Sequence, residues 1–332
     1  MENYRLRDLS IEITHNCPLN CVHCSTFNGG ANPRLRLDSE KIIEIAKQAL
    51  PLGLESVSLS GGEPCTHPEL INIVRNLKSL GIRVSLYSCG VVHDYLSRPV
   101  PLSRAFLESL RAGGLDRIIF NFQSARSKIH EAITQVTGSY GCVIKSIENS
   151  LALKIQTELH TVPMRQNLQS LPDTIDCAKA MGLSRLSLLR FVPQGRGLID
   201  CTTKLPSPSE YKDLTEIVKK ANGFLRLGSP FNFLNHHRKV PCTAGLDKLV
   251  IRGDGKVIPC EAFKQSRIDL GNVKNHHLEQ VWKGGGIISF RNLLVNFCTS
   301  CKSGCLGQEL IKDSLIDPAN PSIYELSEAK II

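Results

Sequence analysis

The sequence predicts an α/β fold with a parallel sheet, followed by a small cysteine-rich C-terminal part. Over roughly the first 200 residues, short apolar and β-branched segments alternate with longer segments whose apolar residues recur at helical spacing. After residue 239 this alternation gives way to a hairpin pattern and further cysteines. The chain has 332 residues, of which 42% are apolar, so it is long enough for one large and one small domain.

The alternating segments define six βα units. The expected strands cover residues 9–14, 55–61, 82–88, 117–123, 155–162 and 185–192, and the expected helices cover residues 39–50, 68–80, 103–113, 140–153 and 171–182. Six units fall short of the eight that close a full barrel, so an open, partial TIM-like barrel and a doubly wound sheet both fit. In either fold, functional residues are expected at the C-terminal ends of the strands.

Four regions follow from these patterns. We expect the barrel at 1–200, a linker region with one helix at 201–238, a cysteine-rich domain at 239–310 and a tail at 311–332. The cysteine-rich domain should begin with a two-stranded hairpin, "KLVIRGDGKVIPC", which turns at Asp254-Gly255.

Composition narrows the compartment and the partners. The net charge is +9, but the basic residues are scattered and aromatic residues make up only 5%, which argues against a nucleic-acid partner. The polar N-terminus lacks a secretory signal and no apolar run is long enough to span a membrane. Thirteen cysteines in such a chain indicate metal or redox chemistry in a reducing cytoplasm.

Three of these cysteines stand together in "CPLNCVHC", directly after the first expected strand. Cys17, Cys21 and Cys24 have the spacing C-x3-C-x2-C. Inert buried thiols are rarely so dense, and a structural zinc ion would need a fourth ligand such as His15 or His23. An iron–sulfur cluster on three thiolates would leave one iron open to a small molecule. The residues alone leave these alternatives open.

The second expected strand ends in "LSGGEPCTHPEL", with Gly61, Gly62, Glu63 and Pro64 in sequence. Paired glycines there would allow a ligand close to the backbone, and Glu63 could accept hydrogen bonds from an ammonium group. Together with C-x3-C-x2-C, this motif resembles the radical S-adenosylmethionine (radical SAM) superfamily. The resemblance covers residues 1–200 and implies a partial (β/α)6 TIM-like barrel. It also implies a 4Fe–4S cluster on the three cysteines, S-adenosylmethionine on the fourth iron, and cleavage to a 5′-deoxyadenosyl radical.

Four further positions are cofactor-binding candidates by this resemblance. Ser88 is the last residue of the third expected strand, and Asn121 lies near the end of the fourth, where relatives often have Ser-Leu-Asp-Gly instead of "NFQS". Gln194 and Gly195, in "VPQGRG" after the sixth strand, resemble the loop that holds the adenine and ribose in relatives.

A second set of cysteines lies in the C-terminal part. It consists of Cys242, Cys260, Cys298, Cys301 and Cys305. The pattern resembles the SPASM/twitch extension of radical SAM enzymes, which holds auxiliary 4Fe–4S clusters. Five cysteines cannot complete two clusters, so we expect one, held by the first four of these cysteines. Cys305 could replace one of them or remain a free thiol, and a zinc ribbon is the alternative.

The reaction is less constrained than the cofactors. The first hypothesis is hydrogen abstraction from a peptide or protein side chain, giving a crosslink, epimerisation or oxidation in peptide maturation. The second is dehydrogenation or epimerisation of a small, carbohydrate-like natural-product precursor, and the third is a non-enzymatic sensor. No recognition domain is expected before the first strand, so a separate recognition protein is a possible partner, with flavodoxin or ferredoxin as electron donor. Candidate hydrogen-donating thiols are Cys65, Cys89 and Cys305.

Overall fold

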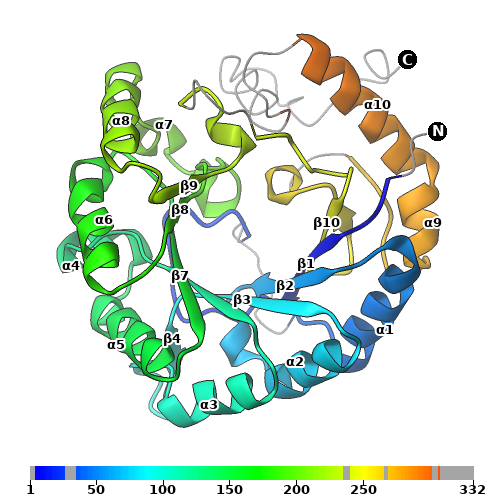
Figure 1. The fold of residues 1–332 in the computed structure, drawn as a ribbon, viewed down its shortest axis with the longest axis horizontal. Helices are drawn as coiled ribbons and strands as arrows, with labels where there is room; N and C mark the ends of the chain where they lie inside the picture. Colours follow the sequence, from blue (N-terminus) through cyan, green and yellow to red (C-terminus); the bar gives the residue numbers. More distant parts are fainter. Residues whose placement is uncertain (1–3, 27–34, 235–239, 265–267, 301–305, 307–332) are drawn as a thin grey trace.

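The curved sheet encloses an interior, and helices surround it on the outside (Figure 1). The computed structural model describes residues 4–26, 35–234, 240–264, 268–300 and 306. Within these residues one sheet has the strand order β11-β10-β1-β2-β3-β6-β7-β8-β9. All neighbouring pairs are parallel except β10 and β11. The predicted partial barrel is therefore confirmed, and the doubly wound alternative is not.

The six predicted strands are all present. They are β1 (Asp8–Thr14), β2 (Ser56–Gly61), β3 (Arg83–Ser88), β6 (Arg117–Asn121), β7 (Gln156–Thr161) and β8 (Leu186–Leu188). Three further strands, β9 (Leu225–Leu227), β10 (Lys248–Ile251) and β11 (Val257–Ile258), extend the sheet at its two ends. Strand β8 is shorter than expected because the chain leaves the sheet after Leu188 to form the loop that approaches the first cysteines.

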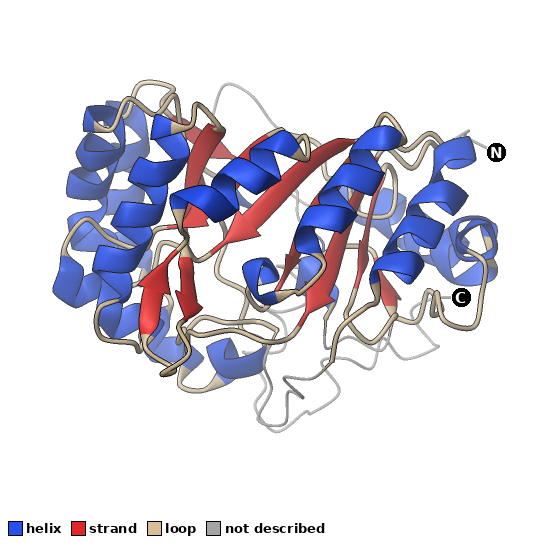
Figure 2. Ribbon diagram, turned by 90° about the horizontal axis from the view of Figure 1, so that it is seen from below, coloured by secondary structure: helices blue, strands red, loops and turns tan. Residues whose placement is uncertain are grey.

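The expected helices cover the outer face of the sheet (Figures 1 and 2). They are α1 (Ser39–Ala49), α2 (Leu70–Ser79), α3 (Arg104–Ala112), α5 (Ser139–Ala152), α6 (Leu171–Ala180) and α8 (Pro208–Lys220). The sequence reasoning missed α4 (Ser127–Thr134), α7 (Cys201–Lys204) and a small hairpin of β4 (Val91–His93) and β5 (Pro99–Pro101). The C-terminal part adds α9 (Leu278–Lys283) and α10 (Gly285–Ser300).

The sequence around Ser207 explains where α8, the helix of the linker region, begins. The Ser207 hydroxyl accepts a hydrogen bond from the Glu210 backbone N–H at 3.3 Å, and the Glu210 carboxylate accepts one from the Ser207 N–H at 2.6 Å. This reciprocal capping satisfies two N–H groups that a helix start would otherwise leave unpaired. Pro208 at the first helical position adds a fixed backbone angle.

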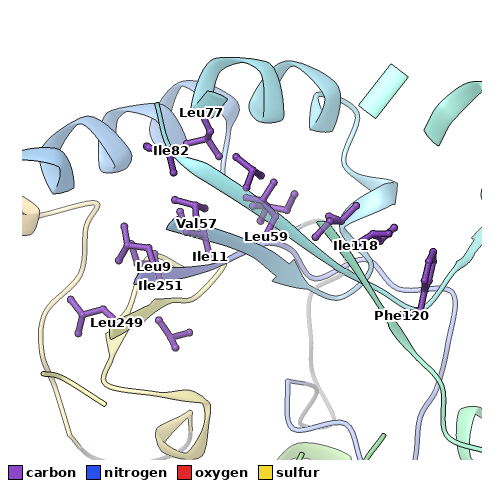
Figure 3. Close-up of a cluster of buried hydrophobic side chains, with 14 of the residues drawn as sticks. Leu9, Ile11, Val57, Leu59, Leu77, Ile82, Ile118, Phe120, Leu249 and Ile251 are labelled. Atoms are coloured by element: carbon purple, nitrogen blue, oxygen red, sulfur yellow. The ribbon is translucent and has the colours of Figure 1, made fainter. Parts of the chain in front are cut away.

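The core lies between the sheet and its helices. Leu9, Ile11, Val57 and Leu59 are almost fully buried on the helix-facing side, together with Leu249 of β10 (Figure 3). Because side chains alternate along a strand, the residues between them face the interior of the barrel. On β1 and β2 these inward residues are polar: Ser10, Glu12, Ser58 and Ser60. The inward face of β1 and β2 is therefore polar, unlike the apolar face that packs against the helices.

The predicted C-terminal hairpin is present, and it belongs to the same sheet as the barrel. Strand β10 pairs with β1 in parallel, with Asp8 opposite Lys248 and Ile11 opposite Ile251. It then turns back through Gly255, whose φ of +87° is readily adopted by glycine, into β11. The sheet thus places the second cysteine-bearing segment beside the strand that leads into the first. The residue ranges that we expect for the four regions of the chain remain predictions.

No helix in the described part of the chain is long and apolar enough to cross a membrane.

Candidate functional site

The first three cysteines share one loop at the C-terminal end of β1. Cys21 lies in a buried cluster with Cys89 and Cys142, and the half-buried Cys17 and Cys24 pack against this cluster. The end of α4 holds this loop in place, because Asn20 and Val22 donate backbone hydrogen bonds to the last carbonyls of that helix at 3.0 and 2.9 Å. The chain therefore brings together the three thiols that the sequence singled out.

The chemistry of these thiols fits an iron–sulfur cluster. Burial, with Cys17 and Cys24 close by, raises the pKa of the Cys21 thiol well above its usual range. Three thiolates crowded in a buried loop repel one another, and a cationic iron centre offsets this repulsion because metal ligation favours the thiolate. Among the described residues, no three His, Cys, Asp or Glu side chains converge closely enough to hold a single metal ion.

Gly61 and Gly62 lie against the backbone of the first cysteine loop, and their expected place beside a ligand remains a prediction. A Cβ atom on Gly61 would lie 2.2 Å from the Thr14 carbonyl oxygen, and one on Gly62 would lie 2.3 Å from that of Asn16. The backbone that leads into the first cysteine loop therefore approaches both glycines closely. The Gly62 N–H donates to the Thr14 carbonyl at 2.6 Å, and the Glu63 N–H donates to that of Asn16 at 2.7 Å. The glycines thus fasten β2 to the start of the cysteine loop.

Glu63 is fully buried and its carboxylate is held by three donors. The backbone N–H groups of Cys65 and Cys89 donate to it at 3.0 and 2.6 Å, and the Ser88 hydroxyl donates at 2.9 Å. Pro64 follows at the first position of a short 3₁₀ turn and is also buried. The orientation of Glu63 is therefore fixed by β2 and β3 together, before any ligand binds.

Ser88 and the two thiol candidates surround that carboxylate. Besides donating to Glu63, the Ser88 hydroxyl accepts a hydrogen bond from the Gly90 N–H at 2.9 Å and faces the Cys65 thiol at 3.7 Å. Burial, reinforced by Glu63, raises the pKa of the Cys65 thiol, and burial with Cys17 and Glu63 nearby raises that of Cys89. Ser88 therefore contacts the Glu63 carboxylate directly, and both cysteines favour the thiol form.

Asn121 closes β6 on the inner face of the sheet. Its side-chain oxygen accepts a hydrogen bond from the Gln123 amide. The Gln123 side-chain oxygen in turn accepts one from the Val162 N–H at 3.2 Å, which ties the ends of β6 and β7 together. Next to Asn121 on β7 lies His160, whose ring centroid is 5.8 Å from that of Tyr87 on β3. Sequence reasoning missed His160 and Tyr87, although both occupy inward positions of predicted strands.

The loop after β8 presses against the first cysteine loop. The Arg196 guanidinium donates to the Cys21 carbonyl at 3.1 Å, and the Gly197 N–H donates to the Cys24 carbonyl at 3.3 Å. Gly195 and Gln194 are buried there, and Gly195 has a φ of +58°. The Gln194 side-chain nitrogen donates to the Ala262 carbonyl at 2.5 Å, while its oxygen has no hydrogen-bond partner among the described residues. That oxygen remains available to an N–H donor on a ligand.

The residue before the last cysteine, His23, lies in a basic surrounding. Burial, with His160 and the positively charged Arg196 close by, lowers its pKa to about 3. Its Nδ1 atom is buried and has no hydrogen-bond partner in the described part of the chain. The ring is therefore neutral at physiological pH and offers a flat, uncharged surface beside the three thiols.

The second set of cysteines is described only in part. Cys242 and Cys260 are half-buried and pack against the main core. Burial lowers the pKa of Lys248, but Glu261 and Cys260 nearby raise it further, so that it lies above its usual range. The positive charge of Lys248 therefore lies near the Cys260 thiol. Cys298 is in α10, but its side chain lies outside the described residues, as do Cys301 and Cys305. Of the four cysteines expected to bind the auxiliary cluster, the structure thus describes the side chains of Cys242 and Cys260.

Two family profiles match the chain. Residues 11–178 match the radical SAM superfamily, and residues 242–305 match the SPASM iron–sulfur cluster-binding domain. The first match covers more than half of the chain and includes all three N-terminal cysteines and the Gly-Gly-Glu-Pro motif.

Individual proteins are similar over most of their length. The PqqA peptide cyclase of Gluconobacter oxydans is 28% identical over 82% of this chain and 75% of its own. An AdoMet-dependent heme synthase of Methanosarcina barkeri is 24% identical over 86% of this chain and 84% of its own. The solved structure of Streptococcus suis SuiB bound to S-adenosylmethionine has the same fold, with a TM-score of 0.72 and 18% identity over 98% of this chain and 78% of that one.

The residues of the site fit the cofactors that this family uses. Three thiols in one loop suit a 4Fe–4S cluster with an open iron, and the fixed Glu63 lies at the neighbouring strand end, where S-adenosylmethionine is expected. The C-terminal cysteines belong to a domain that binds auxiliary iron–sulfur clusters. The chain is an enzyme of the radical SAM superfamily with a C-terminal SPASM domain.

Proposed function

We propose that this enzyme abstracts a hydrogen atom from a side chain of a peptide or protein during peptide maturation, leading to a crosslink, an epimerisation or an oxidation. The observation that carries the proposal is the similarity to PqqA peptide cyclases, which extends through both the barrel and the SPASM domain. The fold agrees, since SuiB, also solved in complex with its precursor peptide SuiA, superimposes with a TM-score of 0.71.

The roles of the chain's own residues follow from the contacts of the site. Cys17, Cys21 and Cys24 would hold the cluster, and Glu63 would accept hydrogen bonds from the ammonium group of S-adenosylmethionine. When bound and reduced, the cluster supplies the electron that cleaves S-adenosylmethionine to the 5′-deoxyadenosyl radical. The loop around Gln194 and Gly195, closed against the cysteine loop, would cover the nucleoside. A covered radical is protected from water and from side reactions.

The interior of the barrel offers the substrate polar groups. Burial lowers the pKa of His160 to about 4, so its ring is neutral at physiological pH, and its Nδ1 atom has no hydrogen-bond partner among the described residues. With Asn121 and Tyr87 beside it, His160 provides donors and acceptors without adding charge. Such a surface suits the amide groups of a peptide backbone.

A small-molecule substrate is the second candidate, and one observation favours it. The heme synthase relative matches 84% of its own length to this chain, and its name describes the synthesis of a small molecule. Dehydrogenation or epimerisation of a carbohydrate-like precursor therefore remains the alternative.

Label transfer separates the two candidates. The protein, purified anaerobically and reduced with dithionite, is incubated with S-adenosylmethionine and with candidate peptides deuterated at their side chains. The proposal predicts deuterium in 5′-deoxyadenosine, measured by mass spectrometry, together with a mass change in the peptide. Label from a small-molecule precursor, with none from any peptide, would favour the alternative. The absence of 5′-deoxyadenosine under all conditions would support the sensor hypothesis.

The proposed partners and cofactors follow from the same chemistry. Flavodoxin or ferredoxin would deliver the electron in a reducing cytoplasm, and a separate recognition protein could present the peptide. We further propose a single auxiliary 4Fe–4S cluster on Cys242, Cys260, Cys298 and Cys301. Iron and sulfide analysis tests this, because two 4Fe–4S clusters contain about eight irons per chain, and about four irons would contradict the auxiliary cluster.

A further inference from the structure

A buried carboxylate lies on the inner face of β1, five positions before the first cysteine. Glu12 is 2% exposed in a strand whose other charged residue is the exposed Asp8 at its start. Burial alone would raise its pKa, but the Lys264 ammonium and His15 lower it to about 2. Glu12 is therefore ionised at physiological pH, and a buried ionised group persists only where a partner compensates it.

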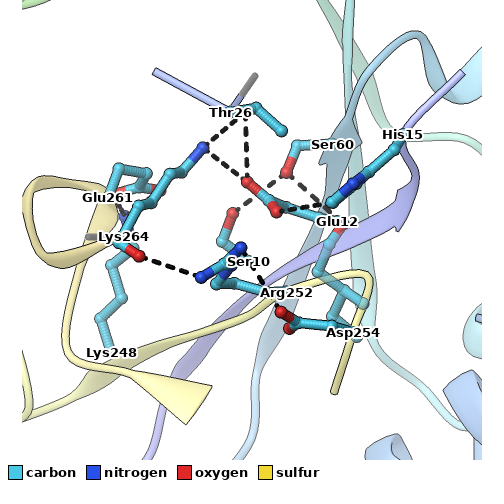
Figure 4. A network of polar contacts seen from close by, with 11 residues as sticks. Ser10, Glu12, His15, Thr26, Ser60, Lys248, Arg252, Asp254, Glu261 and Lys264 are labelled. Carbon is cyan, nitrogen blue, oxygen red and sulfur yellow. Dashed lines mark hydrogen bonds and ion pairs between the residues drawn. The ribbon is translucent and has the colours of Figure 1, made fainter. Parts of the chain in front are cut away.

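That partner comes from the other cysteine-bearing segment. The Lys264 ammonium, four residues after Cys260, lies 2.5 Å from Oε1 of Glu12 and is itself only 9% exposed (Figure 4). Lys264 follows a short 3₁₀ turn (Glu261–Phe263) that begins directly after Cys260. A salt bridge in the interior of the barrel thus joins β1 to the segment that carries an expected ligand of the auxiliary cluster.

The same ammonium also reaches the first cysteine loop. It donates to the Thr26 hydroxyl at 2.7 Å, and Thr26 lies two residues after Cys24 (Figure 4). The Thr26 hydroxyl in turn is 3.5 Å from Oε1 of Glu12. One side chain therefore contacts both the strand that leads into the first cysteine loop and the residue that follows its last cysteine.

The turn that carries Lys264 is held from several sides. Lys248 bonds to the Glu261 carboxylate at 3.0 Å, Gln194 donates to the Ala262 carbonyl, and Arg252 donates to the Lys264 carbonyl at 2.9 Å. Because its backbone is fixed, the turn places the ammonium of Lys264 at a defined point. A displacement of Cys260 would move this ammonium with it.

A second contact runs between the same two segments. The ring of His15, two residues before Cys17, packs on the hairpin turn at Gly253, where an added Cβ atom would lie 3.0 Å from the ring. The two cysteine-bearing segments therefore touch on both sides of the first cysteine loop, before Cys17 and after Cys24.

We propose that Lys264 is a positioning residue that couples the auxiliary cluster site to the S-adenosylmethionine site. Ligation of Cys260 would add a further anchor to this turn, so that Lys264 holds Glu12 and Thr26 and the first cysteine loop keeps its binding geometry. Loss of the ligand at Cys260 relaxes the turn and weakens the binding of S-adenosylmethionine. The inference rests on the radical SAM chemistry of the site and is independent of whether the substrate is a peptide.

The test first cuts one of the two links of Lys264, the one to Thr26, without removing a buried charge. Thr26→Val removes the hydroxyl but keeps the shape of the side chain and the Glu12–Lys264 salt bridge, and Thr26→Ser, which retains the hydroxyl, is the matched control. The dissociation constant of S-adenosylmethionine is measured by anaerobic calorimetry in each protein, with and without Cys260→Ser. Coupling between two sites is typically 5- to 150-fold, so we expect Cys260→Ser to weaken binding about tenfold in the parent and in Thr26→Ser.

In the Thr26→Val protein, binding should already be weaker, and Cys260→Ser should weaken it by less than in the parent, because only the link through Glu12 remains. In the paired variant Glu12→Gln/Lys264→Met, which removes both links and leaves no unpaired charge, Cys260→Ser should change binding by less than about twofold. An equal effect of Cys260→Ser in the parent and in the paired variant would overturn the proposal. If Cys260→Ser does not fold, the paired variant alone is compared with the parent. Unchanged affinity in the paired variant, with full iron content, would also refute the coupling. Because the titration contains no substrate, failure of the peptide hypothesis does not affect its outcome.

Discussion

Replacement of Ser88 by alanine tests whether the Glu63 carboxylate is positioned by the protein. The Ser88 hydroxyl is buried, donates to Glu63 at 2.9 Å and accepts the Gly90 N–H at 2.9 Å. Alanine removes both interactions and offers no polar atom in place of the hydroxyl. The two backbone donors of Cys65 and Cys89 remain on Glu63, so the carboxylate loses one of three partners.

The expected magnitude follows from these two contacts. A hydrogen bond to a charged group contributes about 1.5–3 kcal/mol, and a buried N–H left without a partner costs about 1–3 kcal/mol. The lower ends of the two ranges together give a loss of about 2.5 kcal/mol in the free energy of unfolding. The affinity for S-adenosylmethionine should fall as well, because Glu63 then samples other orientations.

The assay is urea-induced unfolding followed by circular dichroism, with Ser10→Ala as the matched control. Ser10 is a buried serine of the same sheet, and its hydroxyl has one partner among the described residues, that of Ser60 at 3.5 Å. We expect Ser10→Ala to cost less than about 1 kcal/mol. In a Glu63→Gln background the cost of Ser88→Ala should shrink, since the two residues interact. Equal losses for Ser88→Ala and Ser10→Ala would refute the reasoning.

Three further predictions concern the cluster loop and acid stability. Gly62→Ala should lower the free energy of unfolding by about 1–3 kcal/mol and reduce the iron content, because the new Cβ would lie 2.3 Å from a backbone oxygen of the cysteine loop. Gly141→Ala is the control and should change neither quantity, because an added Cβ there has no other atom within 4 Å. Iron analysis and unfolding check both variants, and an iron-replete Gly62→Ala protein would contradict the prediction. Cys21→Ala should abolish cleavage of S-adenosylmethionine to 5′-deoxyadenosine, while Cys298→Ala should retain some cleavage but lose the product; chromatography of the reaction decides both. Burial lowers the pKa of His130 to about 4, so the unfolded chain binds a proton that the folded chain does not. Stability should therefore fall as the pH drops from about 6.5 towards 4, by up to about 1.4 kcal/mol per pH unit. His130→Gln should flatten this part of the stability curve, and an unchanged slope would exclude His130 as its cause.

Much of the site could be predicted because its residues follow strands in the sequence. The cysteine triplet and Glu63 each come directly after a predicted strand, and parallel strands place such residues at one edge of the sheet. The close packing at Gly61 and Gly62 could not be predicted, since their missing side chains make room for the backbone at Thr14 and Asn16. This packing depends on how closely two loops approach, which no local pattern encodes.

The salt bridge between Glu12 and Lys264 could not be predicted from the sequence either. A charged residue, Glu12, stands inside the apolar run "LSIEIT", but nothing in the local sequence gave a reason to single it out. Its partner could not be identified either, because Lys264 is 252 residues away along the chain and becomes adjacent only when β10 pairs with β1.

The sequence by itself determined the order of the βα units, the cysteine loop and the family chemistry. Periodicity and motif spacing are local properties, and six parallel strands with polar residues at their ends leave few arrangements. Only the tertiary structure decided that the C-terminal hairpin continues the barrel's sheet, and that the loop after β8 and the turn after Cys260 both contact the first cysteine loop. These contacts join segments far apart in the chain, and their formation depends on packing and buried charge pairing rather than on local preference.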